Sequence, residues 1–442
     1  MKKFYIKTFG CQMNIYDSAR MAAALETLGY QQTTKQDEAD IILLNTCHIR
    51  EKAAEKLYSE IGRLAEIKNA RRKQGLETLL IVAGCVVQAE KQEMLRRAHG
   101  IDIAVGPQSY HHLPELVMRF EREHGRVVRA DFPADSKFDF LPPHTASTVS
   151  QFLAIQEGCD HFCSYCVVPY TRGCEYSRSM SEIIEEAKRL VNTGAVEIML
   201  LGQNVNCWHG VGEADLPTPD LGDLIRRLGD IKGLKRIRYT TSYPSKITDN
   251  LIQAHRDVEQ LMPYIHLPIQ SGSDRVLKAM NRLYSVAQYE EIIDRFRQAR
   301  PDIAVSSDFI VGFPGETDEE FEQTLEVVHR VCYDSSYSFK YSPRPGTPAS
   351  LMKNQIPEDV KTQRLQRLQE LLLTQQKQAH EKQVGRVLDV LLTEKGRCKG
   401  QLNGYTPYLQ NVHVQAPMEL FGKIIPVKIT RASATSLSAE LI

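Results

Sequence analysis

The sequence predicts an α/β protein built from three domains: a doubly wound α/β domain, a partial (β/α)6 barrel and a small β-barrel. Residues 1–145 alternate apolar, β-branched stretches with amphipathic helical patterns, and residues 146–376 repeat this alternation over six further strands. Residues 377–442 contain the end of a helix and then short β-like stretches with glycine or proline between them. A chain of 442 residues is long enough for about three domains of roughly 150 residues each.

The amino-terminal domain combines a predicted parallel sheet with three regularly placed cysteines. Cys11, Cys47 and Cys85 follow its first three predicted strands and are separated by 36 and 38 residues. The carboxyl ends of parallel strands form the binding edge of a doubly wound sheet, so the three thiols could converge at one site. Three buried structural cysteines are the alternative. The predicted strands are residues 4–9, 41–46, 79–84 and 101–105, and the predicted helices include residues 18–28 and 53–64.

The second domain is predicted to be a parallel partial barrel, because six strands alternate mostly with helices. Such a barrel carries its chemistry at the carboxyl ends of the strands. The predicted strands are residues 152–156, 197–201, 236–241, 264–269, 304–311 and 336–341, and the helices include residues 180–190, 288–297 and 318–331.

The loop after the first barrel strand contains Cys159, Cys163 and Cys166 in a C-x3-C-x2-C spacing. Closely spaced thiolates of this kind bind iron–sulfur clusters. Three thiolates leave one iron of a four-iron cluster open, and such an iron can chelate S-adenosylmethionine beside an electron source and cleave it to a carbon radical. Zinc would need a second ligand pair. A ferredoxin-type cluster would need a fourth thiolate, for which Cys174 is the local candidate.

Polar and glycine-containing segments follow other strands of the predicted barrel. Each alone could be a turn, but their repetition at one edge favours a binding site. Asp308 lies within the fifth strand and could point into the barrel. Arg178 and Arg344 could bind a carboxylate or an RNA phosphate, with solvated surface arginines as the equal alternative. The segments are residues 202–206, 270–273, 312–316 and 342–347.

Composition limits the partners and the compartment. Lysine and arginine number 55, equal to aspartate and glutamate, so no global field attracts nucleic acid and RNA binding must be local. The first ten residues do not form a signal peptide, no apolar run reaches the roughly 18 residues that span a bilayer, and we expect no membrane partner. Ten cysteines without a secretory signal predict a reducing cytoplasmic location. Cys207, Cys332 and Cys398 lack metal-ligand spacing and are predicted to be packing residues.

The carboxyl-terminal region begins with a predicted helix over residues 358–384, which closes the barrel and leads into the third domain. The β-like stretches that follow, residues 386–392, 409–414 and 423–431, predict a small barrel. Tyr405 and Tyr408 could stack on nucleic-acid bases or simply pack the barrel.

The residues around the cysteines resemble one family. Residues 159–173 (CDHFCSYCVVPYTRG) resemble the radical SAM superfamily and, more narrowly, its methylthiotransferases. Residues 8–14 (TFGCQMN), 43–47 (LLNTC) and 83–88 (AGCVVQ) resemble the amino-terminal domain of that family, and residues 385–422 resemble its terminal TRAM domain, which binds RNA. Cys174 departs from the common family pattern, which leaves a redox role for it open.

The resemblance implies two 4Fe-4S clusters, one held by Cys11, Cys47 and Cys85 and the other by Cys159, Cys163 and Cys166. These six cysteines are also the expected catalytic residues. S-adenosylmethionine would bind near the carboxyl ends of the barrel strands. The residues expected beside it are Tyr165, Gln203, Asn204, Gln270, Ser271, Asp308 and Gly312.

Residues 201–205, 266–281, 306–317 and 341–348 resemble family members that modify prenylated adenosine in tRNA. The implied reaction replaces the C2 hydrogen of N6-dimethylallyladenosine, next to the anticodon, with a methylthio group. An aromatic C–H of this kind is too weakly acidic for a side-chain base. The hypothesis is therefore that one S-adenosylmethionine methylates a sulfur on the auxiliary cluster and a second is cleaved to the radical that takes the hydrogen.

The implied partners are tRNA bearing N6-dimethylallyladenosine, a low-potential electron donor and a sulfur donor, and we expect a cytoplasmic monomer. Three alternatives stay open from the sequence. The substrate could be threonylcarbamoyladenosine in tRNA, or an aspartate of a ribosomal protein. The chain could also be a noncatalytic iron–sulfur, RNA-binding redox sensor.

Overall fold

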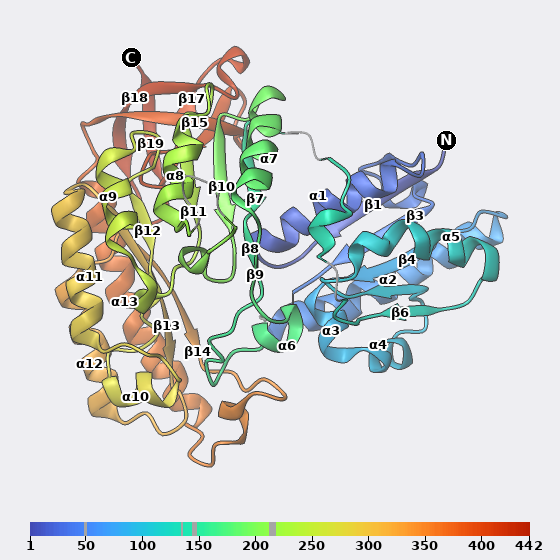
Figure 1. Ribbon diagram of the computed structural model, residues 1–442, viewed down its shortest axis with the longest axis horizontal. Coiled ribbons are helices and arrows are strands. Elements are labelled where there is room, and N and C mark those ends of the chain that lie inside the picture. Colours follow the sequence, from blue (N-terminus) through green and yellow to red (C-terminus); the bar gives the residue numbers. More distant parts are fainter. Residues whose placement is uncertain (48–50, 134–135, 144–147, 212–217) are drawn as a thin grey trace. The chain divides into compact units, whose positions relative to one another are not determined.

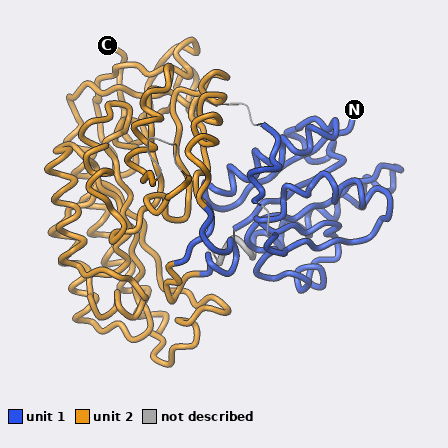
Figure 2. Tube along the Cα trace, viewed as in Figure 1, with its two compact units in different colours: residues 1–145, 157–160, 167–176 blue, residues 146–156, 161–166, 177–442 orange. Residues whose placement is uncertain are grey.

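A computed structural model describes residues 1–47, 51–133, 136–143, 148–211 and 218–442. The chain forms two compact units, shown in Figure 2: unit 1 comprises residues 1–145, 157–160 and 167–176, and unit 2 comprises the remainder. The segment that carries the C-x3-C-x2-C loop is thus divided between the units. None of the helices in the described ranges has the length and apolar character needed to cross a bilayer.

Unit 1 is a six-stranded, all-parallel sheet in the order β2-β1-β3-β4-β5-β6 (Figure 1). One face packs against α1 and α5, and the other packs against α2, α3 and α4. This arrangement confirms the doubly wound prediction. The strands are β1 (Lys3–Thr8), β2 (Gln31–Gln32), β3 (Ile41–Asn45), β4 (Leu79–Ala83), β5 (Ile103–Val105) and β6 (Val127–Arg129), and the helices are α1 (Gln12–Glu26), α2 (Glu51–Lys73), α3 (Cys85–Glu90), α4 (Gln92–Arg97) and α5 (Leu113–Glu123).

Three short elements, one helix and two paired strands, lie around the C-x3-C-x2-C loop in the sequence. Helix α6 (Val168–Arg172) packs against α3, and β8 (Gln156–Glu157) pairs with β9 (Tyr176–Ser177) where the chain passes between the units. The two-residue strand β2 and the three-residue strand β6 were absent from the sequence prediction, because segments this short carry no readable periodicity.

Unit 2 begins with the predicted partial barrel. Its six strands are all parallel and form two three-stranded sheets, β7-β10-β11 and β12-β13-β14, which a bridge between Ile237 and Leu261 connects. Two predicted strands, β10 and β13, match the structure to the residue, whereas β12 ends three residues early. The strands are β7 (Ser150–Ala154), β10 (Glu197–Leu201), β11 (Arg236–Tyr239), β12 (Tyr264–His266), β13 (Ala304–Val311) and β14 (Ser335–Lys340).

The barrel helices begin where the sequence supplies capping residues. Ser179, Asp220, Ser285 and Thr317 each accept a hydrogen bond from the third residue of the helix that follows, whose side chain returns one to the cap backbone. Apolar side chains on the inner faces of these helices pack against the sheets. The helices are α7 (Met180–Asn192), α8 (Leu221–Gly229), α9 (Asp249–Asp257), α10 (Asp274–Ala279), α11 (Val286–Ala299) and α12 (Asp318–Val331).

The long helix α13 (Glu358–Glu381) leads into a closed barrel in the order β15-β16-β17-β19-β18. This confirms the small β-barrel prediction. Two buried arginines of β11 hold it in unit 2: Arg236 donates to the carbonyls of Asp389 and Tyr405, and Arg238 donates to those of Thr406 and Pro407. The strands are β15 (Val387–Lys395), β16 (Gln401–Tyr405), β17 (Asn411–Gln415), β18 (Ile424–Ala432) and β19 (Leu437–Leu441).

The two candidate base-stacking tyrosines lie at this junction within unit 2. Tyr405 and Tyr408 are both partly buried, and the Tyr408 hydroxyl donates to Asp302 at 3.1 Å. The Arg386 guanidinium lies 5.8 Å from the Tyr408 ring centroid. These contacts favour the packing interpretation of Tyr408.

Candidate functional site

The structure places Cys11, Cys47 and Cys85 after three neighbouring strands, β1, β3 and β4. Cys11 is the cap residue of α1, and Cys85 is the first residue of α3. The Cys11 and Cys47 thiols are hydrogen-bonded, and the charge of Cys11 acts on Cys85. The carboxyl edge of the unit 1 sheet therefore gathers the three side chains.

Two glycines make this close approach sterically feasible. Gly10 has φ +126°, and a Cβ there would lie 2.5 Å from the Cys47 Cβ. Gly84 has φ +100°, and a Cβ there would lie 2.4 Å from the Thr46 carbonyl oxygen. Glycine is the residue that adopts such φ values and such close approaches without a steric penalty. The residue before Cys11 and the residue before Cys85 are thus fixed by the geometry of the site.

A buried amide network supports the same edge. Asn14 Nδ2 donates to Asn45 Oδ1 at 3.2 Å, and Asn45 Nδ2 donates to the Asn14 carbonyl at 2.8 Å and to Ser18 Oγ at 3.0 Å. The Cys11 thiol donates to Asn14 Oδ1 at 3.2 Å. The network fixes the start of α1 relative to the end of β3, which are the elements that carry Cys11 and Cys47.

The electrostatic environment favours a thiolate at one of the three positions. The hydrogen bond with Cys47, with the charge of Arg172 as a further cause, lowers the pKa of the Cys11 thiol to about 6. Burial raises the pKa of the Cys85 thiol. Thiolates are the form that binds metal, so a donor set of three thiols with one already favoured as thiolate fits an iron–sulfur cluster.

Arg172 is a functional candidate that the sequence analysis missed. It ends α6 in unit 1, is buried, and pairs with the carboxylates of Asp17 and Glu157. Its positive charge also acts on the Cys85 thiol, where it favours the thiolate against the effect of burial. A single arginine gives no sequence signal of burial, because arginine is normally exposed.

The C-x3-C-x2-C loop is anchored differently at its two ends. In unit 1, the Cys159 amide donates to the Gly173 carbonyl at 3.1 Å. In unit 2, the Cys166 amide donates to the Cys163 carbonyl at 2.9 Å, and the amide and carbonyl of Ser164 bond to Met280 and Ala349. None of the ten cysteines, all within the described ranges, is in a disulfide. In that part of the chain, no three His, Cys, Asp or Glu side chains converge closely enough to hold one single metal ion, a condition that the ligands of a multi-iron cluster do not have to meet, because each binds a different iron.

Arg282, a second residue that the sequence analysis missed, contacts the part of this loop in unit 2. It donates to the Cys163 sulfur at 3.4 Å, to the Tyr284 hydroxyl at 2.7 Å and to the Pro268 carbonyl at 3.0 Å. Its guanidinium lies 4.5 Å from the Tyr243 ring centroid. Arg282 thus places a positive charge and a hydrogen-bond donor beside the sulfur of a predicted cluster ligand.

The neighbouring Asn281 shapes the loop itself. Its side-chain nitrogen Nδ2 donates to the backbone carbonyls of His161 and Phe162, each at 3.1 Å. Phe162 has φ +47°, an uncommon conformation for a residue other than glycine. Asn281 therefore helps to hold a strained turn between the first two cysteines of the spacing.

The residues predicted to lie near S-adenosylmethionine occur at or beside the carboxyl ends of strands in unit 2. The amides of Gln203 and Asn204 after β10 both donate to the Gln156 side chain, at 2.9 and 3.3 Å. The Gln270 amide donates to the Asp308 carbonyl at 2.9 Å. Tyr165 is partly buried and, like Cys166, packs against an apolar core cluster of unit 2.

Ser271 and Gly312 complete this set of predicted residues. The Ser271 hydroxyl is buried and accepts a hydrogen bond from the Ser273 amide at 3.2 Å. Gly312 has φ +70°, and a Cβ there would lie 2.3 Å from Lys361 Cγ. The glycine is therefore explained by packing against α13, whether or not a ligand lies nearby.

His266 adds an ionisable group beside Asp308. Its Nε2 lies 3.5 Å from Asp308 Oδ1, and its Nδ1 lies 3.0 Å from Ser306 Oγ. Both side chains are partly exposed. Together they offer polar contacts to a ligand at this edge of the β12-β13-β14 sheet.

Three sequence interpretations change with the structure. Cys332 and Cys398 are exposed, so the packing prediction is wrong for both: Cys332 caps the end of α12, and Cys398 lies in the turn between β15 and β16. Cys207 is half-buried against an apolar cluster, as predicted. Arg178 is buried and pairs with Glu186 at 2.8 Å, so its carboxylate partner belongs to the protein. Cys174 is exposed.

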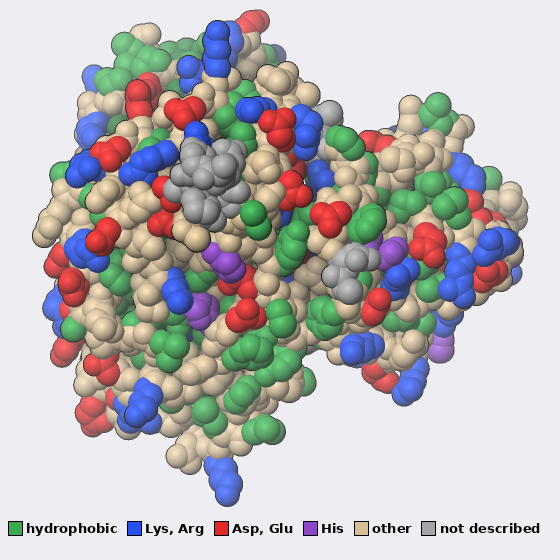
Figure 3. Space-filling model, in the orientation of Figure 1, with side chains coloured by type: hydrophobic (Ala, Val, Ile, Leu, Met, Phe, Trp, Pro, Cys, Tyr) green, Lys and Arg blue, Asp and Glu red, His purple; other side chains and the backbone are tan. Residues whose placement is uncertain are grey.

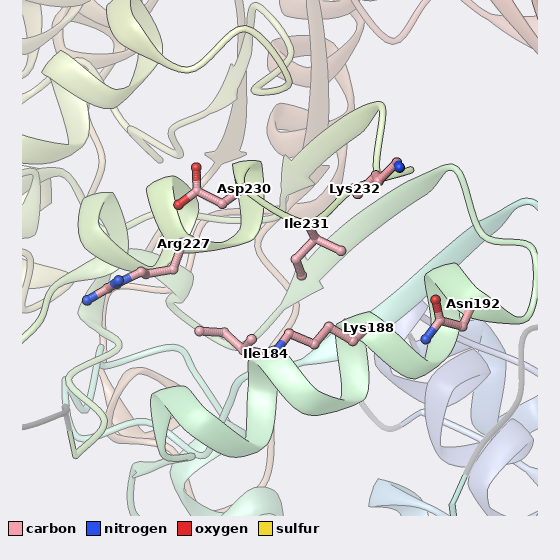
Figure 4. Close-up of a pocket in the computed structure, with 7 residues that line it drawn as sticks. All are labelled: Ile184, Lys188, Asn192, Arg227, Asp230, Ile231 and Lys232. Carbon is pink, nitrogen blue, oxygen red and sulfur yellow. The ribbon is translucent and has the colours of Figure 1, made fainter.

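A surface hollow lies away from these residues. Figure 4 shows a hollow between α7 and the carboxyl end of α8, lined by charged and aliphatic side chains. Barrel helices run antiparallel to the strands, so this hollow lies opposite the carboxyl ends of the strands. On the face drawn in Figure 3, Lys and Arg side chains are interspersed with Asp and Glu side chains.

Three known families match successive parts of the chain. Residues 3–106 match the "Uncharacterized protein family UPF0004", residues 153–328 match the "Radical SAM superfamily", and residues 381–442 match the "TRAM domain". The chain is thus a radical SAM protein, and that superfamily binds a 4Fe-4S cluster and S-adenosylmethionine.

A curated tRNA-2-methylthio-N(6)-dimethylallyladenosine synthase from Agrobacterium fabrum (strain C58 / ATCC 33970) is 53% identical over 445 residues. The match covers 100% of this chain and 97% of the relative. The chain therefore belongs to the radical SAM methylthiotransferase family that includes this synthase.

Solved structures show the same fold at low identity. The radical S-adenosylmethionine methyltransferase TsrM from Kitasatospora setae, with cobalamin and a [4Fe-4S] cluster bound, matches with a TM-score of 0.57 and 14% identity over 79% of this chain and 77% of its own. The cobalamin-dependent radical enzyme OxsB matches with a TM-score of 0.54 and 11% identity over 84% of this chain and 56% of its own.

Proposed function

We propose that the chain is a tRNA methylthiotransferase that converts N6-dimethylallyladenosine, next to the anticodon, into its 2-methylthio derivative. The 53% identity over the whole chain to a synthase named for this product carries the proposal. Three matched families in one order, with cysteines in the first two, support it. We expect a cytoplasmic monomer, because tRNA is the substrate and no second copy is needed to complete the cysteine sets.

Two 4Fe-4S clusters are part of the proposal. Cys11, Cys47 and Cys85 would hold the auxiliary cluster, and Cys159, Cys163 and Cys166 would hold the cluster that meets S-adenosylmethionine. Together with two S-adenosylmethionine molecules per turnover, the bound clusters would supply a methyl group, a sulfur site and a carbon radical. An electron donor of low potential and a sulfur donor are the further partners that this chemistry requires.

The protein residues have separate tasks in this proposal. Arg282 would keep Cys163 oriented as a ligand, because it ties the thiol sulfur to the Pro268 carbonyl. Gln203, Asn204, Gln270 and Asp308 would orient S-adenosylmethionine at the carboxyl ends of the strands. The carboxyl-terminal barrel would bind tRNA. Arg236 and Arg238 attach this barrel to β11 within unit 2, which supports a tRNA contact near the β10-β11 edge.

Nucleoside mass spectrometry tests the proposal. Reduced, sulfide-reconstituted protein is incubated anaerobically with S-adenosylmethionine and with tRNA that carries or lacks the dimethylallyl group. We expect a methylthio mass gain on prenylated adenosine alone, with Cys332→Ala as an active control for the exposed cysteines. Accumulation of 5′-deoxyadenosine with unmodified tRNA would reject the substrate and keep the radical chemistry.

A further inference from the structure

Four charged side chains are buried together in unit 1 and form a charge quartet of Asp17, Lys137, Glu157 and Arg172. Each side chain is only 1–3% exposed. Arg172 Nη2 lies 2.8 Å from Asp17 Oδ2, and Arg172 Nη1 bonds to Glu157 Oε1. Lys137 Nζ lies 2.5 Å from Glu157 Oε2 and 3.6 Å from Asp17 Oδ1. With two cations and two carboxylates, the quartet is neutral.

The two cations of the quartet have different surroundings. Lys137 donates to the Pro107 carbonyl at 2.9 Å and lies 4.5 Å from the Tyr110 ring centroid. Arg172 instead ends α6, which packs against α3, and α3 begins at Cys85. The charge of Arg172 acts on the thiols of Cys85 and Cys11, on each more strongly than the opposing charge of Asp17.

The segments that Arg172 joins are those that carry the cysteines. Asp17 lies on α1, which begins directly after Cys11. Glu157 precedes Cys159 by two residues. A single guanidinium thus connects α1 with the strand that leads into the C-x3-C-x2-C loop, and the helix that it ends packs against the helix that begins at Cys85.

Structural stabilisation alone does not account for this arrangement. A buried ion pair contributes little net stability, because the desolvation of its charges offsets their attraction. A neutral quartet with no further task could be replaced by apolar side chains of similar volume. Thiolates collected in a buried site, by contrast, need a fixed opposite charge, and Arg172 is the cation of the quartet whose charge acts on Cys11 and Cys85.

We propose that Arg172 is a positioning residue of the site formed by Cys11, Cys47 and Cys85, where its guanidinium is the fixed positive charge for the thiolate ligands and their cluster. The inference rests on the proposed function, which assigns these cysteines an iron–sulfur cluster. A positive charge at this place stabilises the more negative, reduced state of a cluster. The loss of the charge therefore shifts the reduction potential of the cluster to more negative values.

The test is an EPR-monitored potentiometric titration in full-length protein whose Cys159, Cys163 and Cys166 are changed to alanine, so that only the amino-terminal site can hold a cluster. Three forms are compared with this parent. Arg172→Gln removes the cation, Arg172→Lys keeps a cation, and the pair Arg172→Gln with Asp17→Asn removes the cation while keeping the quartet neutral. Iron content and thermal unfolding of the apo proteins are measured in parallel.

We expect Arg172→Gln to shift the potential to more negative values and Arg172→Lys to recover most of the shift. The double variant should regain stability relative to Arg172→Gln, yet its potential should stay below that of the parent, because the charge of Arg172 outweighs that of Asp17. Equal potentials for the parent and the double variant, or equal shifts for lysine and glutamine, would overturn the role of Arg172. A parent without any cluster would overturn the cluster assignment as well.

Discussion

The two cysteine sets each have a buried arginine, but the two arginines are held in different ways. Arg172 in unit 1 is balanced by the carboxylates of Asp17 and Glu157. Arg282 in unit 2 is enclosed by the rings of Tyr243 and Tyr284, 4.5 and 5.1 Å from their centroids. No ion pair of Arg282 with a carboxylate is found in the part of the chain that the structure describes. Both guanidiniums stay protonated, but the charge of Arg172 is balanced by two neighbouring carboxylates, whereas the charge of Arg282 is stabilised by aromatic rings.

The comparison shows two ways in which a protein can stabilise a buried cation beside thiols. In the amino-terminal site, a neutral charge quartet balances the cation, and the desolvation of its four charged groups costs free energy. The barrel loop uses polarisable rings and hydrogen bonds to a carbonyl, a hydroxyl and a sulfur. The amino-terminal site should therefore depend more on charge balance, and the barrel loop more on local packing.

The largest expected effect separates the tasks of the two cysteine sets. Cys85→Ala should abolish methylthiolation but retain the cleavage of S-adenosylmethionine to 5′-deoxyadenosine. Cys163→Ala should abolish both, because its loop would bind the cluster that meets S-adenosylmethionine. Both products are measured by mass spectrometry after the same anaerobic incubation. Retained 5′-deoxyadenosine formation in Cys163→Ala would contradict the division of tasks.

The two arginines should differ in their contribution to stability. Arg172→Gln leaves two buried carboxylates with one lysine, a loss that typically destabilises by about 3–5 kcal/mol. Arg282→Gln leaves no buried carboxylate unpaired and should destabilise by about 1–3 kcal/mol through lost hydrogen bonds and ring contacts. Urea unfolding of the two apo proteins, followed for each unit separately, measures both values. A larger loss for Arg282→Gln would reverse the comparison.

A smaller effect on stability is expected from a substitution that disturbs the close packing of the amino-terminal site, and the chain offers a matched control for it. Gly84→Ala forces both a left-handed φ and a clash with the Thr46 carbonyl, whereas Gly29→Ala has φ +81° but nothing within 4 Å. Backbone strain alone is about 1–3 kcal/mol, so Gly84→Ala should lower the free energy of unfolding by more than Gly29→Ala does. It should also lower the iron content after reconstitution, and equal losses would show that the clash is relieved.

The smallest expected effect is a pH dependence at Cys11. Because the pKa of this thiol is lowered to about 6, its thiolate should predominate from about pH 6 upward in the apo protein. An ordinary cysteine reaches the same point near pH 8.5. The stabilisation that comes with the lowered pKa is present at alkaline pH and is lost as the pH falls through about 6. Alkylation rates by iodoacetamide, resolved by peptide mass spectrometry, measure the midpoint.

Much of the fold was predictable because hydrophobic periodicity is local. Strands β10 and β13 and helix α12 were placed to the residue, and the cysteine positions followed from the ends of predicted strands. The short strands β2, β6, β16 and β19 were missed, since pairing across the sheet defines them more than their own sequence does.

The supporting residues of the site were harder to predict, because they depend on contacts between distant segments. Arg172 meets Asp17 across 155 residues, and Arg282 meets Cys163 across 119. Neither contact leaves a spacing pattern. Arg172 lies within the family-like segment 159–173 and Arg282 directly follows segment 266–281, but an arginine is ordinarily a surface residue and neither segment shows that its arginine is buried. Only the folded chain shows that both arginines are buried beside thiols.

The most direct test of the two-site account is the iron and acid-labile sulfide content of anaerobically reconstituted protein. Intact protein should bind about eight irons, and a variant with Cys11, Cys47 and Cys85 changed to alanine should bind about four. A variant with Cys159, Cys163 and Cys166 changed to alanine should also bind about four. If either triple variant keeps the full iron content of the intact protein, the assignment of one cluster to each cysteine set is wrong.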